Sequence, residues 1–284
     1  MAIDYRKQHI VITSERGLLD LKLKELGQYK DLIFILAKKD FDHKYKQTIL
    51  GPAWAFINPF LTSLVHMFIF GTIANIGTGN IPRIIFYLFS NNLWSVFSSC
   101  LNENSQTFLS NRSLFGKVYF PRIAMPISKL LVIIFRWCIQ TTVSLPFYIY
   151  FLANGGIHPN LMMFIFIPLI LLWMALLGSS IGMIVSSSTT KYRDLSMLVG
   201  FSVNLLMYIS PVVYPLSQLD GSRWKILALI NPVSAPCELF RLIIFGSGQI
   251  VPWSLILSIT FTILLTFLGL IVFNRVEKDF IDTV

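Results

Sequence analysis

The chain has few charged residues and few cysteines for its length. Only 13% of its 284 residues are Asp, Glu, Lys or Arg, and only 14 are acidic. So little charge, together with 55% hydrophobic residues and a mean hydropathy of +0.68, excludes an ordinary soluble domain. Cys100, Cys138 and Cys237 are far apart and form no CxxC, so neither a disulfide framework nor a metal site is indicated. The sequence is that of a membrane protein.

The basic residues are not gathered on one soluble face. A net charge of +9 would suggest nucleic acid if Lys and Arg clustered in a folded soluble region, but they lie between apolar runs. We therefore expect no nucleic-acid partner. The first 30 residues also lack the basic start, apolar centre and small-residue exit of a cleavable signal.

Six apolar runs approach or exceed the roughly 20 residues needed to cross about 30 Å of hydrocarbon. Because backbone groups in lipid must be hydrogen-bonded internally, these runs are predicted to be helices rather than strands. The expected fold class is an all-α membrane protein with six transmembrane helices. The predicted spans are residues 54–74, 84–101, 130–152, 161–185, 195–216 and 252–273.

The distribution of Lys and Arg predicts the orientation. Eighteen of the 23 lie in segments on the side of the N-terminus, four lie on the other side, and the remaining one is Arg136, inside a span. Both termini are therefore predicted to be cytosolic. The expected organisation is a cytosolic segment 1–52, a six-span membrane domain 53–274 and a cytosolic tail 275–284.

The segment 31–47 has an apolar patch too short to cross the membrane, followed by mixed charge. This pattern is typical of an amphipathic helix lying in the membrane plane, with Leu32, Ile35 and Leu36 as its apolar face. A soluble helix that packs on a partner is the alternative.

Two connections are too long to be simple turns. The cytosolic connection 102–129 mixes apolar and basic residues and ends in prolines, which favours a docking element. The outer connection 217–251 holds two short apolar pieces separated by Asn231 and Pro232. Each piece is too short to span, so short re-entrant helices are predicted.

The predicted spans contain no Asp or Glu and a single histidine, His66. Transporters driven by ion gradients usually carry such groups within their spans, so ion coupling is not favoured. The Gly116-Lys117 pair is not a nucleotide site, since Asn111 replaces the first glycine of the phosphate-binding motif and no Ser or Thr follows. We expect no catalytic residue, metal or cofactor in this chain, and any motor is another polypeptide.

The stretch YKQTILGPAWAFINPF, residues 45–60, resembles the start of the first span in permeases of ABC-2 type polysaccharide exporters, the O-antigen and teichoic-acid transporter subunits. The resemblance continues from about residue 30 to the end of the chain. Further matching pieces are LFGKVYFPRIAMP (114–126), KYRDL (191–195), YISPVVYP (208–215), NPV (231–233) and NRVEKDF (274–280).

The resemblance implies a homodimer of six-span permeases in the bacterial cytoplasmic (inner) membrane. Two copies of a separate ATPase subunit, which bind ATP and Mg, would drive a polyprenyl-pyrophosphate-linked polysaccharide through a channel at the dimer interface. The residues that it assigns to ATPase coupling are Tyr45, Lys46, Gln47, Arg112, Phe115, Lys117 and Arg122.

Aromatic residues make up 14% of the chain, and sugar rings pack their C–H faces on aromatic planes while hydroxyls and amides hydrogen-bond them. The glycan-channel candidates are Phe56, Phe60, Tyr87, Asn91, Asn92, Trp94, Asn204 and Tyr208. Asn91 and Asn92 also predict that the second span turns a polar face away from lipid. The pair Gly178 and Gly182 predicts close helix approach, which we place within one subunit.

Arg136 lies inside the third predicted span, where an arginine is a functional candidate. It is predicted to receive a lipid pyrophosphate, to pair with Glu103 at the end of the second span, or to extend to the headgroups.

Two other functions remain open at this stage. One is an ABC-2 permease for a drug, peptide or lipid. The other is a membrane-embedded glycosyltransferase or acyltransferase, which would need acidic or histidine residues at a membrane face, where the outer connections offer only Asp220, Glu238 and His158.

Overall fold

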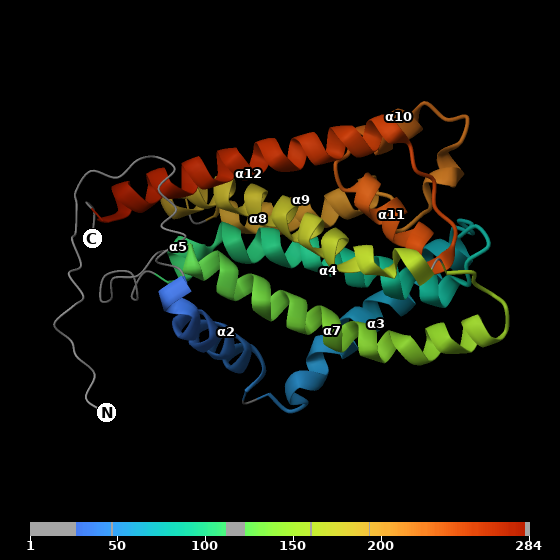
Figure 1. Cartoon of the computed structure of the whole chain (residues 1–284), viewed down its shortest axis with the longest axis horizontal. Coiled ribbons are helices and arrows are strands. Elements are labelled where there is room, and N and C mark those ends of the chain that lie inside the picture. Colours follow the sequence, from blue (N-terminus) through green and yellow to red (C-terminus); the bar gives the residue numbers. More distant parts are fainter. Residues whose placement is uncertain (1–26, 47, 112–122, 160, 193, 282–284) are drawn as a thin grey trace.

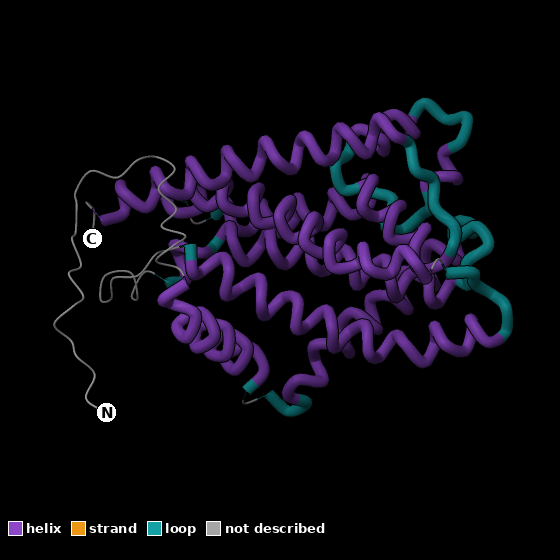
Figure 2. The backbone as a smooth tube through the Cα atoms, viewed as in Figure 1, coloured by secondary structure: helices purple, strands orange, loops and turns teal. Residues whose placement is uncertain are grey.

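The computed structural model describes residues 27–46, 48–111, 123–159, 161–192 and 194–281. Throughout these ranges the chain forms helices joined by turns, with no strand (Figure 2). The all-α prediction is confirmed. The main helices are α2 (Lys30–Tyr45), α3 (Trp54–His66), α4 (Arg83–Ser105), α5 (Thr107–Ser110), α7 (Ala124–Ala153), α8 (Ile167–Lys191), α9 (Leu195–Ile209), α10 (Trp224–Ile230), α11 (Ser234–Phe245) and α12 (Pro252–Ile281).

Within the described ranges, five helical segments are long and apolar enough to cross a membrane. They coincide with the predicted spans that begin at residues 54, 84, 130, 161 and 252. The first consists of α3 and a π-helical continuation, η4 (Met67–Ile73). The spanning segments are Gly51–Ile73, Arg83–Ser105, Ala124–Ala153, Phe164–Thr189 and Pro252–Arg275.

The remaining predicted span, 195–216, is helical only in its first part. Helix α9 has 15 residues, which at 1.5 Å per residue gives about 22 Å, and it ends at Ile209. Ser210 already has an extended conformation (ψ 150°), as expected for a residue that precedes a proline. Pro211 cannot donate a helical hydrogen bond, so the chain continues non-helically to Pro215. The prediction of one helix through residue 216 is wrong in its second part.

The outer connection contains the two short helices that the sequence predicts. Helix α10 has 7 residues and α11 has 12, and they meet at an angle of 90°. Figure 1 shows α10 at one end of the bundle and α2, α5 and the end of α12 at the other. The bend follows from Asn231, which leaves the helical conformation with ψ 119° just before Pro232.

Helix α4 is the centre of the bundle, because 78% of its most apolar window is buried. It packs closely on α8 through Gly178 and Gly182. A Cβ atom on Gly178 would lie 2.4 Å from the carbonyl oxygen of Phe97, and one on Gly182 would lie 2.6 Å from that of Leu101. Only glycine allows this approach, and the predicted contact within one subunit is confirmed.

Helix α2 packs on α7 at the edge of the bundle. Ile33 and Leu36 are buried against Ala124 and Met125 at the start of α7. Ile35, which belongs to the predicted apolar face, is 63% exposed and does not contact α7 in this way. The helix exists where the sequence predicts it, while its position in the membrane plane stays a prediction.

Candidate functional site

A group of charged side chains joins α2, α4 and α7, which we call the α2 charge cluster: Asp40, Lys44, Glu103, Lys129 and Arg136. Arg136 donates to the Glu103 carboxylate at 2.5 Å, and the Lys44 ammonium lies 3.6 Å from the same oxygen. Of the roles predicted for Arg136, pairing with Glu103 is therefore confirmed. Helix α4 extends to Ser105, so Glu103 belongs to the helix of the second span and not to the connection after it.

Burial shapes the electrostatics of this cluster. Burial, and after it the nearby Arg136 guanidinium, lowers the pKa of Lys44. Burial also raises the pKa of Asp40, although Lys129 opposes that shift. Lys129 donates to the Thr107 hydroxyl at 2.9 Å and to the backbone carbonyl of Glu103. Three cations thus meet two carboxylates between three helices.

Arg136 is not a free intramembrane cation. Its side chain is 10% exposed and its guanidinium is ion-paired, while its Nε has no hydrogen-bond partner among the described residues. A role in binding a lipid pyrophosphate remains a prediction, and it would have to compete with Glu103.

The predicted coupling residues are described only in part. Tyr45 is buried at the end of α2, with its ring 4.8 Å from that of Phe41, and Lys46 is exposed. The others, Gln47, Arg112, Phe115, Lys117 and Arg122, lie outside the described residues.

Four of the glycan-channel candidates are buried in α4: Tyr87, Asn91, Asn92 and Trp94. Asn91 donates to the Ser63 hydroxyl at 2.8 Å and lies 3.2 Å from the His66 ring, and Asn92 donates to Ser144 at 3.3 Å. The prediction that these amides find partners within the chain is confirmed. All four side chains are at most 5% exposed within this single chain.

The other four candidates are less enclosed. Asn204 and Tyr208 are exposed on α9, and Phe56 and Phe60 are half-buried on α3. The Tyr208 ring lies 6.5 Å from that of His66 on α3. The Phe60 ring instead lies 6.1 Å from that of Phe147 on α7.

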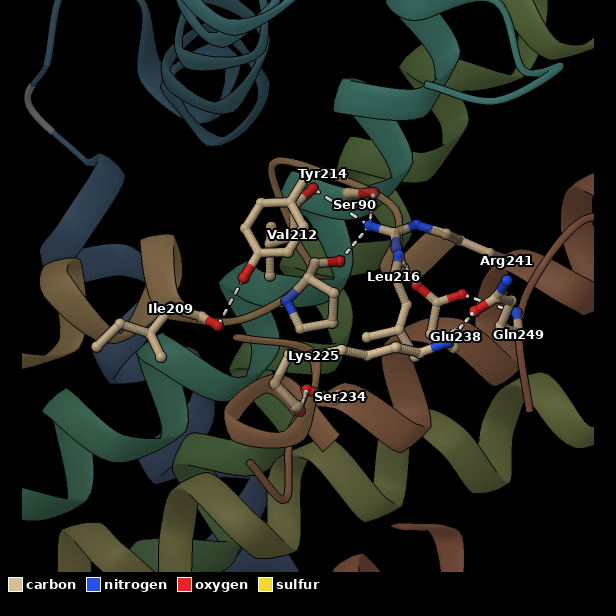
Figure 3. Close-up of polar contacts among 12 residues, drawn as sticks. Ser90, Ile209, Val212, Tyr214, Leu216, Lys225, Ser234, Glu238, Arg241 and Gln249 are labelled. Atoms are coloured by element: carbon tan, nitrogen blue, oxygen red, sulfur yellow. Dashed lines mark hydrogen bonds and ion pairs between the residues drawn. The ribbon is translucent and has the colours of Figure 1, made fainter. Parts of the chain in front are cut away.

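A second ion pair lies at the other end of the bundle, in α11, and sequence reasoning missed it. The Arg241 guanidinium donates to the Glu238 carboxylate with an N–O distance of 2.5 Å, and both side chains are almost fully buried (Figure 3). The Glu238 carboxylate also accepts the backbone N–H of Leu216 at 3.0 Å and that of Gln249 at 2.9 Å. It therefore joins α11 to segments on both sides of it in the sequence.

Arg241 faces the broken end of α9. Its Nη2 donates to the carbonyl oxygens of Pro211 and Val212, the latter at 3.3 Å, and to the Ser90 hydroxyl at 3.3 Å. The guanidinium lies 4.5 Å from the centre of the Phe86 ring on α4. The signal in the sequence is the spacing of three between opposite charges in an apolar segment, which places them on one helical face.

Comparisons with known proteins agree with this architecture. A family profile described as ABC-2 type transporter matches residues 31–245. An O-antigen export system permease protein, RfbA, from Klebsiella pneumoniae is 26% identical over 93% of this chain and 99% of its own length. RfbA from Myxococcus xanthus is 28% identical over 74% of this chain and 79% of its own. The polysialic acid transport protein KpsM of Escherichia coli is 24% identical over 81% and 87%.

Proposed function

This chain belongs to the ABC-2 type transporter family, and from that premise we propose that it is the permease subunit of an ATP-driven exporter of an O-antigen-like polysaccharide. The observation that carries the proposal is the alignment with an O-antigen export permease over 93% of this chain and 99% of the relative. The cargo is a glycan linked to a polyprenyl pyrophosphate, and it crosses the cytoplasmic membrane of a bacterium. Both termini lie in the cytosol.

The energy comes from a separate ATPase subunit, present in two copies, that holds ATP and Mg. The two acidic side chains described in the helices of the bundle interior, Glu103 and Glu238, are each ion-paired with an arginine, so neither is free to exchange a coupling ion. Movement of the ATPase reaches the membrane domain through α2 and the connection 102–129. Because the α2 charge cluster links α2 to α4 and α7, a displacement of α2 acts on both helices.

The channel forms between two copies of the chain, along α3 and α9. Asn204 and Tyr208 are exposed on α9, and Phe56 and Phe60 are half-buried on α3. An amide in the middle of an apolar helix needs a polar partner, which a second copy or a sugar hydroxyl supplies. The buried candidates on α4 then support the channel wall instead of lining it.

Arg136 is the proposed contact for the pyrophosphate as the carrier enters. The test compares Arg136→Gln with the double variant Glu103→Gln/Arg136→Gln at matched protein levels, since the double variant leaves no unpaired carboxylate. Loss of export in both variants supports the contact, while export that returns in the double variant assigns Arg136 a purely structural role.

The function is tested in a bacterial strain that makes a lipid-linked glycan but lacks its own export permease. This chain, expressed together with its cognate ATPase subunit, is expected to restore glycan at the cell surface only when both proteins are present and the ATPase can hydrolyse ATP. Uphill export by the purified chain alone, in liposomes with a proton or sodium gradient, would contradict the proposal.

A further inference from the structure

We propose that Glu238 and Arg241 are positioning residues that fasten the end of α9, helix α11 and the chain leading into α12 into one body, the outer cap, which moves as a unit when cargo passes. The outer cap comprises residues 210–216 and 231–249. The proposal rests on the proposed function for the direction of transport.

The first observation is that Arg241 hydrogen-bonds backbone carbonyls in the non-helical segment that follows α9. The helix ends at Ile209, and the carbonyls of Pro211 and Val212 have no further helical turn to accept from. Backbone groups at membrane depth need such partners. Arg241 donates to both carbonyls from α11. Arg241 therefore joins the segment that follows α9 to α11.

The second observation is that Glu238 accepts hydrogen bonds from backbone N–H groups, whereas Arg241 donates hydrogen bonds to backbone carbonyls. Its two carboxylate oxygens accept from Leu216 and Gln249, which lie on opposite sides of α11 in the sequence. A further contact, from the Asn231 amide to the Ser210 hydroxyl at 2.8 Å, joins the α10–α11 corner to the same end of α9. Both ions are buried, so water cannot replace these contacts at low cost.

The third observation concerns the border of this body. The cap rests on Phe86 and Ser90 of α4 through Arg241. On a neighbouring side of α4, Tyr87 packs its ring towards Gly71 of the π-helix η4, and its buried hydroxyl has no hydrogen-bond partner in the part of the chain that the structure describes. Buried polar groups are normally paired, so this contact is less complete than that of the cap. The outlet therefore opens along the border with η4 and the residues that follow it, and not inside the cap.

The first test bridges two residues within the cap. In a variant whose native cysteines are replaced by alanine, Ser210→Cys and Asn231→Cys are joined by oxidation, or by a short bismaleimide where the disulfide does not form. Because both positions are buried, the extent of bridging is measured as loss of maleimide labelling after the protein has been unfolded. Export at the level of the unbridged protein is expected. Export that stops on bridging and returns on reduction of the disulfide would overturn the proposal.

The matched control bridges the segment that follows residue 216 of the outer cap to the loop that follows η4. Gln218 follows the cap segment, and its side-chain nitrogen lies 2.6 Å from where a Cβ on Gly77 would be, after η4. Bridging Gly77→Cys to Gln218→Cys is expected to stop export. If export continues, the cap does not move against this loop and the proposal fails.

The second test separates the backbone contacts from the ion pair itself. Leu216 is 1% exposed, so the variant Leu216→Cys is expected to resist maleimide when Glu238 and Arg241 are native. Ser217 is exposed beside it, so Ser217→Cys is expected to be labelled whether or not Glu238 and Arg241 are changed. Arg241→Gln is expected to expose Leu216→Cys. The exchange Glu238→Arg/Arg241→Glu keeps an ion pair but puts a donor in place of the acceptor and an acceptor in place of the donor. In this variant Leu216→Cys is expected to be labelled by maleimide, and export is expected to be lost.

If the exchange variant instead regains both protection and export, attraction between the two charges is sufficient and the positioning role is wrong. The labelling result does not depend on the cargo. If the native protein with its ATPase exports no glycan, the proposed function fails, whereas the labelling pattern still decides whether Arg241 and Glu238 hold the cap together.

Discussion

Arg136 and Arg241 are both paired with a glutamate, but their surroundings differ. The Arg241 pair is enclosed on all sides, whereas Glu103 has a side chain that is 28% exposed and shares its carboxylate with the half-exposed Lys44. A buried charge that loses its partner is costly, while replacing both partners removes much of the cost. The stability lost on substitution therefore depends on whether one partner of the pair is replaced or both are.

Glu103→Gln leaves the Arg136 guanidinium buried without its counter-ion. We expect a loss of about 3 kcal/mol in the free energy of unfolding, the lower end for a broken buried pair because Glu103 is partly exposed. Thermal unfolding in detergent measures it, with the exposed Asp31→Asn on α2 as the control. Addition of Arg136→Gln is expected to recover part of the loss, and a purely additive double variant would show that the two side chains do not interact.

The two pairs also show what a sequence predicts at this scale. The Glu103–Arg136 pair can be predicted from the sequence because a lone arginine inside an apolar span needs a counter-ion, and the end of the preceding span offers one. Glu238 and Arg241 were counted as residues of an outer loop, since neither lies in a run of 20 apolar residues. Their burial depends on where α9 ends, which is a tertiary feature.

At the scale of helices, the close packing of α4 on α8 depends on Gly178 and Gly182, which have no side chain. Gly178→Ala is expected to push the two helices apart, because the added Cβ would meet the backbone of α4 at 2.4 Å. Overpacking of this kind costs about 1–3 kcal/mol. Gly200→Ala on α9 is the control, since nothing lies within 4 Å of its added Cβ, and it is expected to be neutral or stabilising by up to about 1 kcal/mol. Equal melting temperatures for the two variants would contradict this packing.

Helix α2 offers a second matched pair. Ile33 is 6% exposed against α7 and its neighbour Phe34 is 66% exposed. Ile33→Ser is expected to release α2 from α7, at a cost of about 2–4 kcal/mol in docking free energy, whereas Phe34→Ser is not. Limited proteolysis at residues 48–50 reports the release. Equal cleavage of both variants would show that Ile33 does not hold the helix.

The elements also differ in how far the sequence determines them. Long apolar runs predict spans because hydrocarbon leaves few alternatives for the backbone, and five of the six are found with small changes at their ends. The end of α9 was not predicted, since hydropathy continues through 210–216, although Pro211 and Pro215 were visible signals. The residues by which α2 contacts α7, Ile33 and Leu36, do not follow from the sequence, because apolar residues 32–36 occupy several sides of so short a helix.

At the scale of the whole molecule, α10 lies opposite the end of the bundle that holds α2, α5 and the end of α12 (Figure 1). If α9 completes the crossing that its 15 residues begin, both termini share one side. We expect Ser217→Cys to react with an impermeant maleimide added outside intact cells, and Thr48→Cys to react only after the membrane is opened. External labelling of Thr48→Cys would reverse the proposed orientation.

The burial of α4 has a consequence for how the protein is made. Its membrane segment is largely enclosed by neighbouring helices, whereas only 17% of the corresponding window of α12 is buried. Of those neighbours, α3 precedes α4 and carries Ser63, the partner of Asn91, whereas α7 and α8 follow α4, so Asn92 first meets the translocon and lipid without Ser144 as a partner. Stable integration of α4 must therefore wait until α7 and α8 emerge from the ribosome, and a nascent chain that stops before α7 leaves it poorly retained in the bilayer.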